Sequence, residues 1–285
     1  MKVRLWFLTI AALGLCTVFC IPSAQAAVFT LDDLNSSTCI NTATQAGMYC
    51  WDVDDESHLM KQWFWYSLGA EEFSIDTLAI VGEAKTAADT LQVWYQLAGK
   101  FDLFVTYVLD GGAVGSGSSH ISETIQIRNI SGASLPFKFF QYTDFDLMST
   151  PDDDSIVVMT TGSVPTAFLQ TDGTASFAIA ETIASPSPSS FQAGIHDTLL
   201  ASLNDGSATV LDGTASAGPG NVEFIWAWDL NLPNNAELVN IFKDKRTTFT
   251  ADGGTTSIPI PEPSSLLLLG GALVGMAVWV WRKQR

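Results

Sequence analysis

Aspartates gather near the middle of the chain, around the end of one expected strand. Asp144 and Asp146 lie two apart, and Asp152, Asp153 and Asp154 follow in a row. Carboxylate oxygens on strand ends and loops are ligands that Ca²⁺ prefers, although the spacing differs from that of an EF-hand. Asp144 and Asp146 could alternatively serve glycoside hydrolysis if they faced each other across a cleft. A third interpretation is a run of solvated charges. The residues alone leave these three interpretations open, and no cofactor other than calcium is expected.

The three histidines give no sign of a catalytic or metal centre in the sequence. His58, His120 and His196 do not lie three or four residues from one another or from a cysteine, so no zinc site is predicted. No serine lies in a Gly-x-Ser-x-Gly frame, and a Gly-rich phosphate loop is lacking. We therefore expect each histidine to be a surface or half-buried polar residue, and we predict that the chain is not an enzyme.

Several tryptophans could stack on sugar rings if they were exposed. Trp226 and Trp228 share the apolar face of one expected strand, so core packing accounts for both. Trp94 has the opposite parity from Val93 and Tyr95 and should point away from their face. Trp94 is therefore the better candidate for an exposed aromatic contact.

Apolar and polar residues alternate along much of the chain, as is typical of half-buried strands. Residues 91–97 and 101–109 predict a hairpin with a turn at Gly99. Residues 197–203 indicate a helix, with Asp197 as its N-cap. Further strands are expected at 121–127, 136–147, 156–161, 164–171, 175–182 and 222–230. Strands at intervals of about ten to fifteen residues predict an all-β fold, an antiparallel two-sheet β-sandwich of jelly-roll or Ig-like type.

The N-terminus has the layout of a secretory signal peptide. Lys2 and Arg4 precede an apolar run over residues 5–21, and Ala24-Gln25-Ala26 forms a small-x-small cleavage site. Cleavage is expected after Ala26, which makes residues 1–26 a signal peptide.

Two cysteines then remain in the exported body. An even number of cysteines in an exported protein suggests one disulfide, between Cys39 and Cys50. Two free thiols or half of a metal site are the alternatives, and neither has further ligands at suitable spacing. A bridge over this short loop would contribute about 2–3 kcal/mol.

Negative charge dominates the body between the two ends. Residues 27–260 contain 8 basic and 29 acidic residues, so their net charge of −21 exceeds the −17 of the whole chain. Such a surface repels nucleic acid and anionic lipid, which excludes nucleic acid as an expected partner. It is typical of a soluble exported protein.

The C-terminus combines a rigid polar tripeptide, an apolar run and a basic tail. Pro261, Glu262 and Pro263 precede an uninterrupted apolar stretch that ends at Trp281, and three cations close the chain. Proline disfavours helix at the residue before it, so the helix can begin only after Pro263. The apolar run then predicts a transmembrane helix over 264–281. The cations suit the cytoplasmic side. The expected domains are the signal peptide, a β-sandwich body (27–246), a polar linker (247–260) and the C-terminal segment (261–285).

This C-terminal segment resembles the PEP-CTERM sorting signal of Gram-negative bacteria that make exopolysaccharide. The match rests on Pro261, Glu262 and Pro263 with Ser264, the leucine run, the Gly-rich apolar helix and the Arg-Lys end. The resemblance implies an exosortase as partner, a membrane-embedded protease that cleaves near the Pro-Glu-Pro. The helix would then anchor the chain in the inner membrane only transiently. The implied location is the cell surface or the extracellular space.

The sorting signal describes delivery and leaves the role of the body open. Because no catalytic frame was found, we predict a structural or interaction component of an exopolysaccharide matrix. The alternative is a secreted polysaccharide-binding protein or hydrolase acting on polysaccharide. In either case exopolysaccharide is the expected partner outside the cell.

Overall fold

A computed structural model describes residues 28–249 of the chain. The predicted signal peptide (1–26), the sorting segment (261–285) and the transmembrane helix (264–281) lie outside the described residues. Within the described part, no helix is both long enough and apolar enough to span a membrane. The fold reported below is therefore that of the expected body.

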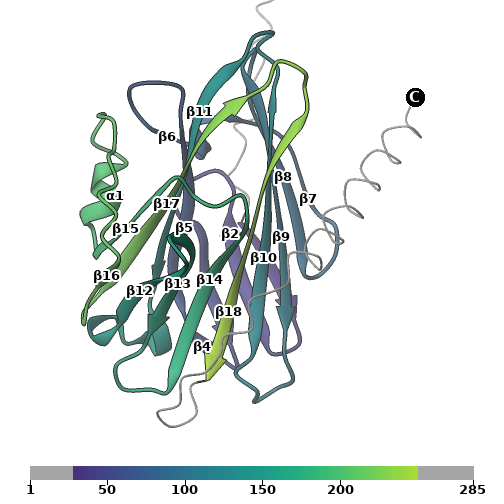
Figure 1. The fold of residues 1–285 in the computed structure, drawn as a ribbon. Coiled ribbons are helices and arrows are strands. Elements are labelled where there is room, and N and C mark those ends of the chain that lie inside the picture. Colours follow the sequence, from purple (N-terminus) through teal and green to yellow (C-terminus); the bar gives the residue numbers. More distant parts are fainter. Residues whose placement is uncertain (1–27, 250–285) are drawn as a thin grey trace, which may run out of the picture.

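The described chain forms two sheets of nine strands each, so the all-β prediction is confirmed (Figure 1). The first sheet, called sheet A, contains β1 (Val28–Asp33), β2 (Ser36–Asn41), β3 (Gly47–Val53), β4 (Glu56–Ser57), β5 (Leu59–Ser67), β6 (Phe73–Ser74), β11 (Leu135–Phe145), β15 (Ser190–Ile195) and β17 (Val222–Leu232). The second, called sheet B, contains β7 (Ala79–Lys85), β8 (Thr90–Leu97), β9 (Phe101–Gly111), β10 (Ser119–Asn129), β12 (Ser155–Thr161), β13 (Val164–Thr171), β14 (Phe177–Ser185), β16 (Ser216–Ala217) and β18 (Leu238–Phe249).

Helical structure is confined to short segments between the strands. One α-helix, α1 (Thr198–Ser202), and three single-turn 3-10 helices at Ile75–Thr77, Leu147–Ser149 and Pro151–Asp153 occur in residues 28–249. The helix falls inside the predicted span 197–203. The connection between β11 and β12 contains two of the 3-10 turns, and it borders the residues described below.

Strand order brings distant parts of the chain together. In sheet A the order is β1-β2-β3-β5-β11-β17-β15, and in sheet B it is β16-β12-β13-β14-β18-β10-β9-β8-β7. The pairs are antiparallel except for β3 with β5. The predicted hairpin is present as β8 and β9, with Gly99 in the left-handed region (φ 69°). Eighteen strands exceed the seven to nine of an Ig-like sandwich and the eight of a jelly roll, so neither predicted subtype fits this count.

Aromatic side chains fill the space between the two sheets. Phe168 of sheet B packs against Trp226 of sheet A with ring centroids 4.3 Å apart, and Tyr66 packs against Phe101 at 5.1 Å. Trp226 and Trp228 are buried, as their shared parity predicted. Residues of both parities are buried over the first part of β17, so both faces of this strand are covered there. Burial of such rings is the main favourable term for this fold.

The interior also contains four charges that sequence analysis did not identify. Glu123 of β10, Glu181 of β14, and Lys243 and Lys245 of β18 are all fully buried and form a neutral network. Lys245 Nζ lies 2.7 Å from Glu123 Oε1, and Gln141 Nε2 of sheet A donates to Glu181 Oε1 at 2.5 Å. Although burial opposes ionisation of Glu123, the two lysines lower its pKa. Removing one member would therefore leave an unpaired buried charge.

The last strand continues beyond the expected start of the linker. β18 extends to Phe249, whereas the linker was expected from residue 247. Thr247 pairs with Ile179 of β14, and its hydroxyl donates to the Gly117 carbonyl at 2.8 Å and accepts from Ser119 N at 2.8 Å. Those bonds explain why a polar residue belongs to the sandwich here. The rest of the expected linker lies outside the described residues.

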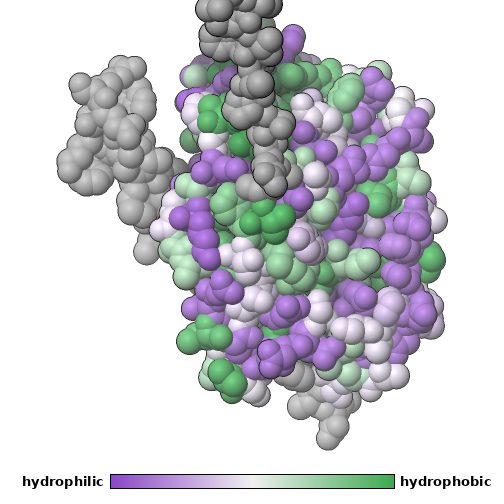
Figure 2. Space-filling view, turned by 180° about the vertical axis from the view of Figure 1, so that it is seen from behind, coloured by the Kyte–Doolittle hydropathy of each residue, from purple (hydrophilic) through white to green (hydrophobic). Residues whose placement is uncertain are grey.

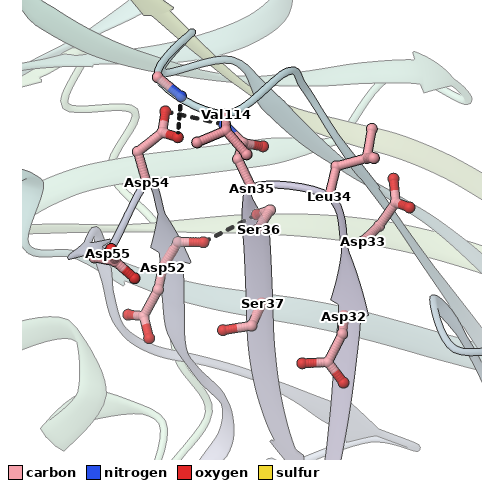
Figure 3. Close-up of a pocket in the computed structure, with 11 residues that line it drawn as sticks. Asp32, Asp33, Leu34, Asn35, Ser36, Ser37, Asp52, Asp54, Asp55 and Val114 are labelled. Carbon is pink, nitrogen blue, oxygen red and sulfur yellow. Dashed lines mark hydrogen bonds between the residues drawn. The ribbon is translucent and has the colours of Figure 1, made fainter.

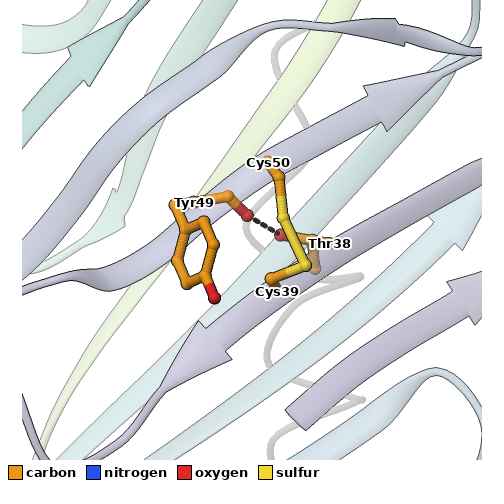
Figure 4. Close-up of a disulfide and its surroundings, with 4 residues drawn as sticks. All are labelled: Thr38, Cys39, Tyr49 and Cys50. Carbon is orange, nitrogen blue, oxygen red and sulfur yellow. Dashed lines mark hydrogen bonds between the residues drawn. A yellow bond between two sulfur atoms is a disulfide. The ribbon is translucent and has the colours of Figure 1, made fainter. Parts of the chain in front are cut away.

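A disulfide joins the first strands of sheet A. Cys39 of β2 and Cys50 of β3 are bonded with their Cα atoms 5.7 Å apart (Figure 4). The Thr38 hydroxyl donates to the Tyr49 carbonyl at 3.3 Å beside the bridge. The bridge therefore links two strands that are already paired and closes a loop that is local in sequence.

The described surface mixes polar and apolar residues. In Figure 2, seen from the side opposite to Figure 1, hydrophilic residues are interspersed with smaller hydrophobic areas. Large apolar side chains that are exposed include Leu34, Val114 and Val210, which come from separate loops. Single exposed apolar residues of this kind are ordinary for a protein surface in water.

Candidate active site

Four neighbouring strands of sheet A position the polar side chains of the candidate site. β5, β11, β17 and β15 follow one another in that order. Lys61 on β5 pairs directly with Asp144 on β11. His196 comes directly after β15, and its Nδ1 lies 3.0 Å from Asp144 Oδ2. On the other side, His196 Nε2 lies 3.2 Å from Asp197 Oδ1. The imidazole therefore lies between a buried carboxylate and an exposed one.

Burial determines the proton affinity of Asp144. It raises the pKa of this carboxyl to about 7, and the charge of Glu223 adds to the rise. His196 and the Tyr142 hydroxyl oppose the rise, because both favour the charged carboxylate. Burial also lowers the pKa of Lys61, against the opposing effect of Asp144. Ionisable groups whose pKa values are displaced by burial and by specific neighbours are characteristic of functional sites.

Glu223 on β17 organises the start of α1. Its Oε1 accepts a hydrogen bond from Leu199 N at 2.5 Å, and its Oε2 accepts from Asp197 N at 3.1 Å and the Tyr142 hydroxyl at 2.6 Å. Asp197 was expected to cap this helix through its side chain. It occupies the N-cap position but makes no capping bond, because its backbone is left-handed (φ 67°) rather than in the β region typical of a cap. Glu223 takes that role, and the Asp197 carboxylate lies beside His196 instead.

The two partners of the pair differ in their access to solvent. The His196 side chain is 34% exposed, whereas the Asp144 side chain is 3% exposed. The imidazole can therefore meet a bound molecule, while the buried carboxylate behind it can fix its orientation and stabilise its protonated form. An exposed imidazole with a carboxylate behind it can transfer a proton to or from a bound molecule.

The remaining aspartates predicted as calcium ligands fall into two groups. Burial raises the pKa of Asp146, and the charge of Asp152 adds to that rise. Asp153 and Asp154 meet Asp172, and carboxylate oxygens of these three residues lie within 4.8 Å of one another. Sequence analysis missed Asp172, which follows β13. An Asp-Gly turn at 172–173 between two predicted strands was the available signal.

An acidic pocket of about 730 Å³ lies at another place on sheet A (Figure 3). It is lined by Asp32, Asp33, Leu34, Asn35, Ser36, Ser37, Asp52, Asp54, Asp55, Val114 and Gly115. Asp54 accepts hydrogen bonds from Gly115 N at 2.5 Å, Gly117 N at 2.7 Å and Asn35 Nδ2 at 3.0 Å. The hydrogen bond from the Gly115 backbone has the largest effect on the pKa of Asp54, followed by that from Gly117, and both lower it. Its carboxylate thus ties the β9–β10 loop to sheet A, which is a structural role.

The other histidines and Trp94 lie in different surroundings. His58 is 1% exposed and stacks on Phe177 with ring centroids 4.2 Å apart, so the expectation of a surface or half-buried residue is wrong for it. His120 is half-buried, as expected, beside Asp110 at 3.5 Å. Trp94 is half-buried and stacks on Phe104, on the face of sheet B away from the core.

Comparison with solved structures shows where this sandwich occurs elsewhere. A bacterial glucoamylase complexed with acarbose matches 87% of the chain with a TM-score of 0.55 at 10% identity, and the chain spans 36% of that protein. A candidate aldose 1-epimerase from Escherichia coli K12 is matched over its entire length, with 79% of the chain, a TM-score of 0.51 and 10% identity. No curated protein matches the chain by sequence.

At 10% identity these likenesses establish the fold alone. They nevertheless contradict the prediction that the chain is not an enzyme, because both matched proteins are described as sugar-processing enzymes. That prediction depended on the lack of familiar catalytic frames in the sequence. His196 and Asp144 come from separate segments of the chain, so no contiguous frame in the sequence could have shown that they meet.

The C-terminal resemblance is confirmed by a family model. The model for the PEP-CTERM protein-sorting motif matches residues 259–284, which include Pro261, Glu262 and Pro263. This motif implies export and processing by an exosortase on the way to the cell surface or the extracellular space. The chain is therefore a carrier of the PEP-CTERM sorting motif, with a body whose fold is also found in sugar-processing enzymes.

Proposed function

We propose that the body is an exported enzyme that acts on a sugar by proton transfer at His196. The observation that carries this proposal is the contact of 3.0 Å between His196 Nδ1 and the buried Asp144 carboxylate. With the Asp144 carboxylate beside Nδ1, the other ring nitrogen, Nε2, lies beside the exposed carboxylate of Asp197. The shared fold with sugar-processing enzymes supports a sugar as the substrate class.

Interconversion of the two anomers of an aldose is the reaction that fits these groups best. The Asp197 carboxylate takes the proton of the anomeric hydroxyl while the His196 imidazolium gives a proton to the ring oxygen. The bond between the anomeric carbon and the ring oxygen breaks, and the open-chain aldehyde forms. Rotation about the neighbouring carbon–carbon bond and reversal of both transfers give the other anomer. Asp144 acts here as a positioning residue for the imidazole.

Glycoside hydrolysis is a weaker candidate for this site. It requires two carboxyl groups that both reach the substrate, separated by about 5–9.5 Å. The second carboxylate near Asp144 belongs to Glu223. It is fully buried, and its oxygens already accept hydrogen bonds from Tyr142 and from the start of α1. A carboxylate whose acceptor positions are occupied in this way is unsuited to act as nucleophile or base.

Charge and delivery narrow the substrate further. The body expected to be exported has a net charge of −21, so it repels polyanionic sugars. Sorting to the outside places it near exopolysaccharide, the partner predicted from the sequence. We therefore propose that the substrates are neutral sugars of the extracellular matrix. The protein itself would be attached to that matrix or reside in it.

Exchange between anomers can be measured directly by NMR. The purified chain should accelerate exchange between the anomers of glucose or galactose, and His196→Gln should reduce that acceleration by about 10²–10⁴-fold. His120→Gln is the matched control, because His120 is also half-buried beside an aspartate but belongs to sheet B. A chain that leaves the exchange rate unchanged for neutral hexoses, or an equal loss in both variants, would contradict the proposal.

A further inference from the structure

Three carboxylates from two separate segments meet beside the β11–β12 connection. Asp153 ends a 3-10 turn, Asp154 follows it, and Asp172 comes directly after β13. Their oxygens lie within 4.8 Å of one another. Gly173 allows this close approach, since a Cβ at that position would lie 2.5 Å from the Asp153 carbonyl oxygen. The turn between β13 and β14 is thus packed directly against Asp153.

Hydrogen bonds to these carboxylates leave one oxygen of Asp153 and one oxygen of Asp154 without a partner among the described residues. Asp154 is completely buried, and its Oδ2 accepts from Gln170 Nε2 at 2.6 Å and Leu147 N at 3.2 Å. Its Oδ1 has no hydrogen-bond partner among the described residues, and neither has Asp153 Oδ1. A buried carboxylate oxygen without a partner costs free energy, so it calls for a ligand or a proton.

No cation of the described chain offsets this negative charge. None of the ion pairs within residues 28–249 includes Asp153, Asp154 or Asp172. His58 lies near Asp172, but burial lowers the pKa of His58 to about 4, which leaves its ring neutral at pH 7.

We propose that Asp153, Asp154 and Asp172 bind a calcium ion. Calcium takes oxygen ligands at about 2.3–2.6 Å, so two ligands of one ion can lie up to about 5 Å apart, and the spacing of these oxygens fits. Calcium also accepts irregular sets of carboxylate ligands, and the unpartnered oxygens of Asp153 and Asp154 supply two of them. An exported protein meets this ion at the concentrations that weak extracellular sites require, about 10⁻⁴–10⁻³ M.

Such an ion would offset the repulsion between like-charged carboxylates on two neighbouring segments. It would link the start of β12 to the β13–β14 turn. Through Asp154 Oδ2 and Leu147 N, it would also secure the residues after β11. Gln170 Nε2 donates to the Phe145 carbonyl at 2.9 Å in the same place, directly after Asp144. Calcium binding itself does not depend on the enzymatic role proposed for Asp144.

The test is calcium titration of the purified full chain after treatment with EDTA, followed by calorimetry and thermal unfolding. We expect CaCl₂ to bind at one site and raise the Tm by several degrees, and MgCl₂ at equal ionic strength to do much less. Asp153→Asn should weaken calcium binding at least tenfold. This variant is suitable because the Oδ1 of Asp153 supports no hydrogen bond of the fold. Asp205→Asn, at an exposed turn, is the control that reports non-specific binding to the acidic surface.

Two results would overturn the proposal. In the first, calcium leaves the Tm of the unsubstituted chain unchanged, while Asp153→Asn raises the Tm in EDTA. This result would show that a proton, and not calcium, reduces the repulsion between the three carboxylates. The other is an equal response to calcium in Asp153→Asn and Asp205→Asn, or an equal response to magnesium. Because binding and Tm are measured without any sugar, failure of the enzymatic proposal would leave this test unaffected.

Discussion

Replacing Asp144 by asparagine should change stability in opposite directions at low and at neutral pH. The carboxyl has a pKa of about 7 in the folded chain, against 3.8 for the ordinary side chain. A raised pKa means that the folded state prefers the protonated form, so Asp144 costs no stability below about pH 4. The cost grows as the pH rises to about 7 and stays constant above it. The difference in proton affinity corresponds to at most about 4 kcal/mol.

Asparagine cannot ionise, so it removes this cost. A buried amide with an unsatisfied group introduces a penalty of about 1–3 kcal/mol at every pH. We therefore expect Asp144→Asn to be more stable than the unsubstituted chain by about 1–3 kcal/mol at pH 8 and less stable by a similar amount at pH 4. Stability gained at pH 8 together with lost exchange activity would be typical of a residue retained for function.

Urea unfolding at pH 4, 6 and 8, with the disulfide intact, measures both values. At each pH, the free energy of unfolding of the unsubstituted chain is subtracted from that of the variant. The change in this difference between pH 4 and pH 8 is the informative quantity, because penalties that do not depend on pH cancel in it. Asp205→Asn, at an exposed turn, is the control for replacing a carboxylate by an amide away from the buried site. A difference for Asp144→Asn that stays constant with pH would refute the reasoning about its burial.

Three further predictions concern the core, the disulfide and delivery. Lys243→Met should lower the free energy of unfolding by about 3–5 kcal/mol, because it leaves a buried carboxylate charge unpaired. Lys138→Met, which removes a partly exposed ion pair, should lower it by less than about 1 kcal/mol. Equal losses for the two variants in urea unfolding would contradict this prediction. Cys39 and Cys50 should resist alkylation without reductant in exported material, and mass spectrometry that finds both alkylated would exclude the bridge. The mature chain should lack everything beyond the Pro-Glu-Pro only in a host with an exosortase, and an intact Arg285 in that host would contradict sorting.

The sequence by itself determined the features that are read locally. The sorting motif is contiguous, so its residues could be recognised without a fold, and the family model agrees over 259–284. Alternation along the strands predicted the all-β class and the β8–β9 hairpin, because a strand's two faces are encoded by neighbouring residues. The parity of Trp226 and Trp228 likewise predicted their burial.

Only the tertiary structure decided which polar residues meet. His196 reaches Asp144 because β15, β17 and β11 are adjacent in sheet A, and Asp172 reaches Asp153 because one turn folds against another. The buried Glu123 and its lysine partners depend on β18 lying beside β10. Strand order and register across a sandwich are set by contacts between distant segments, so local patterns cannot specify them. For that reason the sequence predicted how this protein is delivered, and the fold was needed to propose what it does.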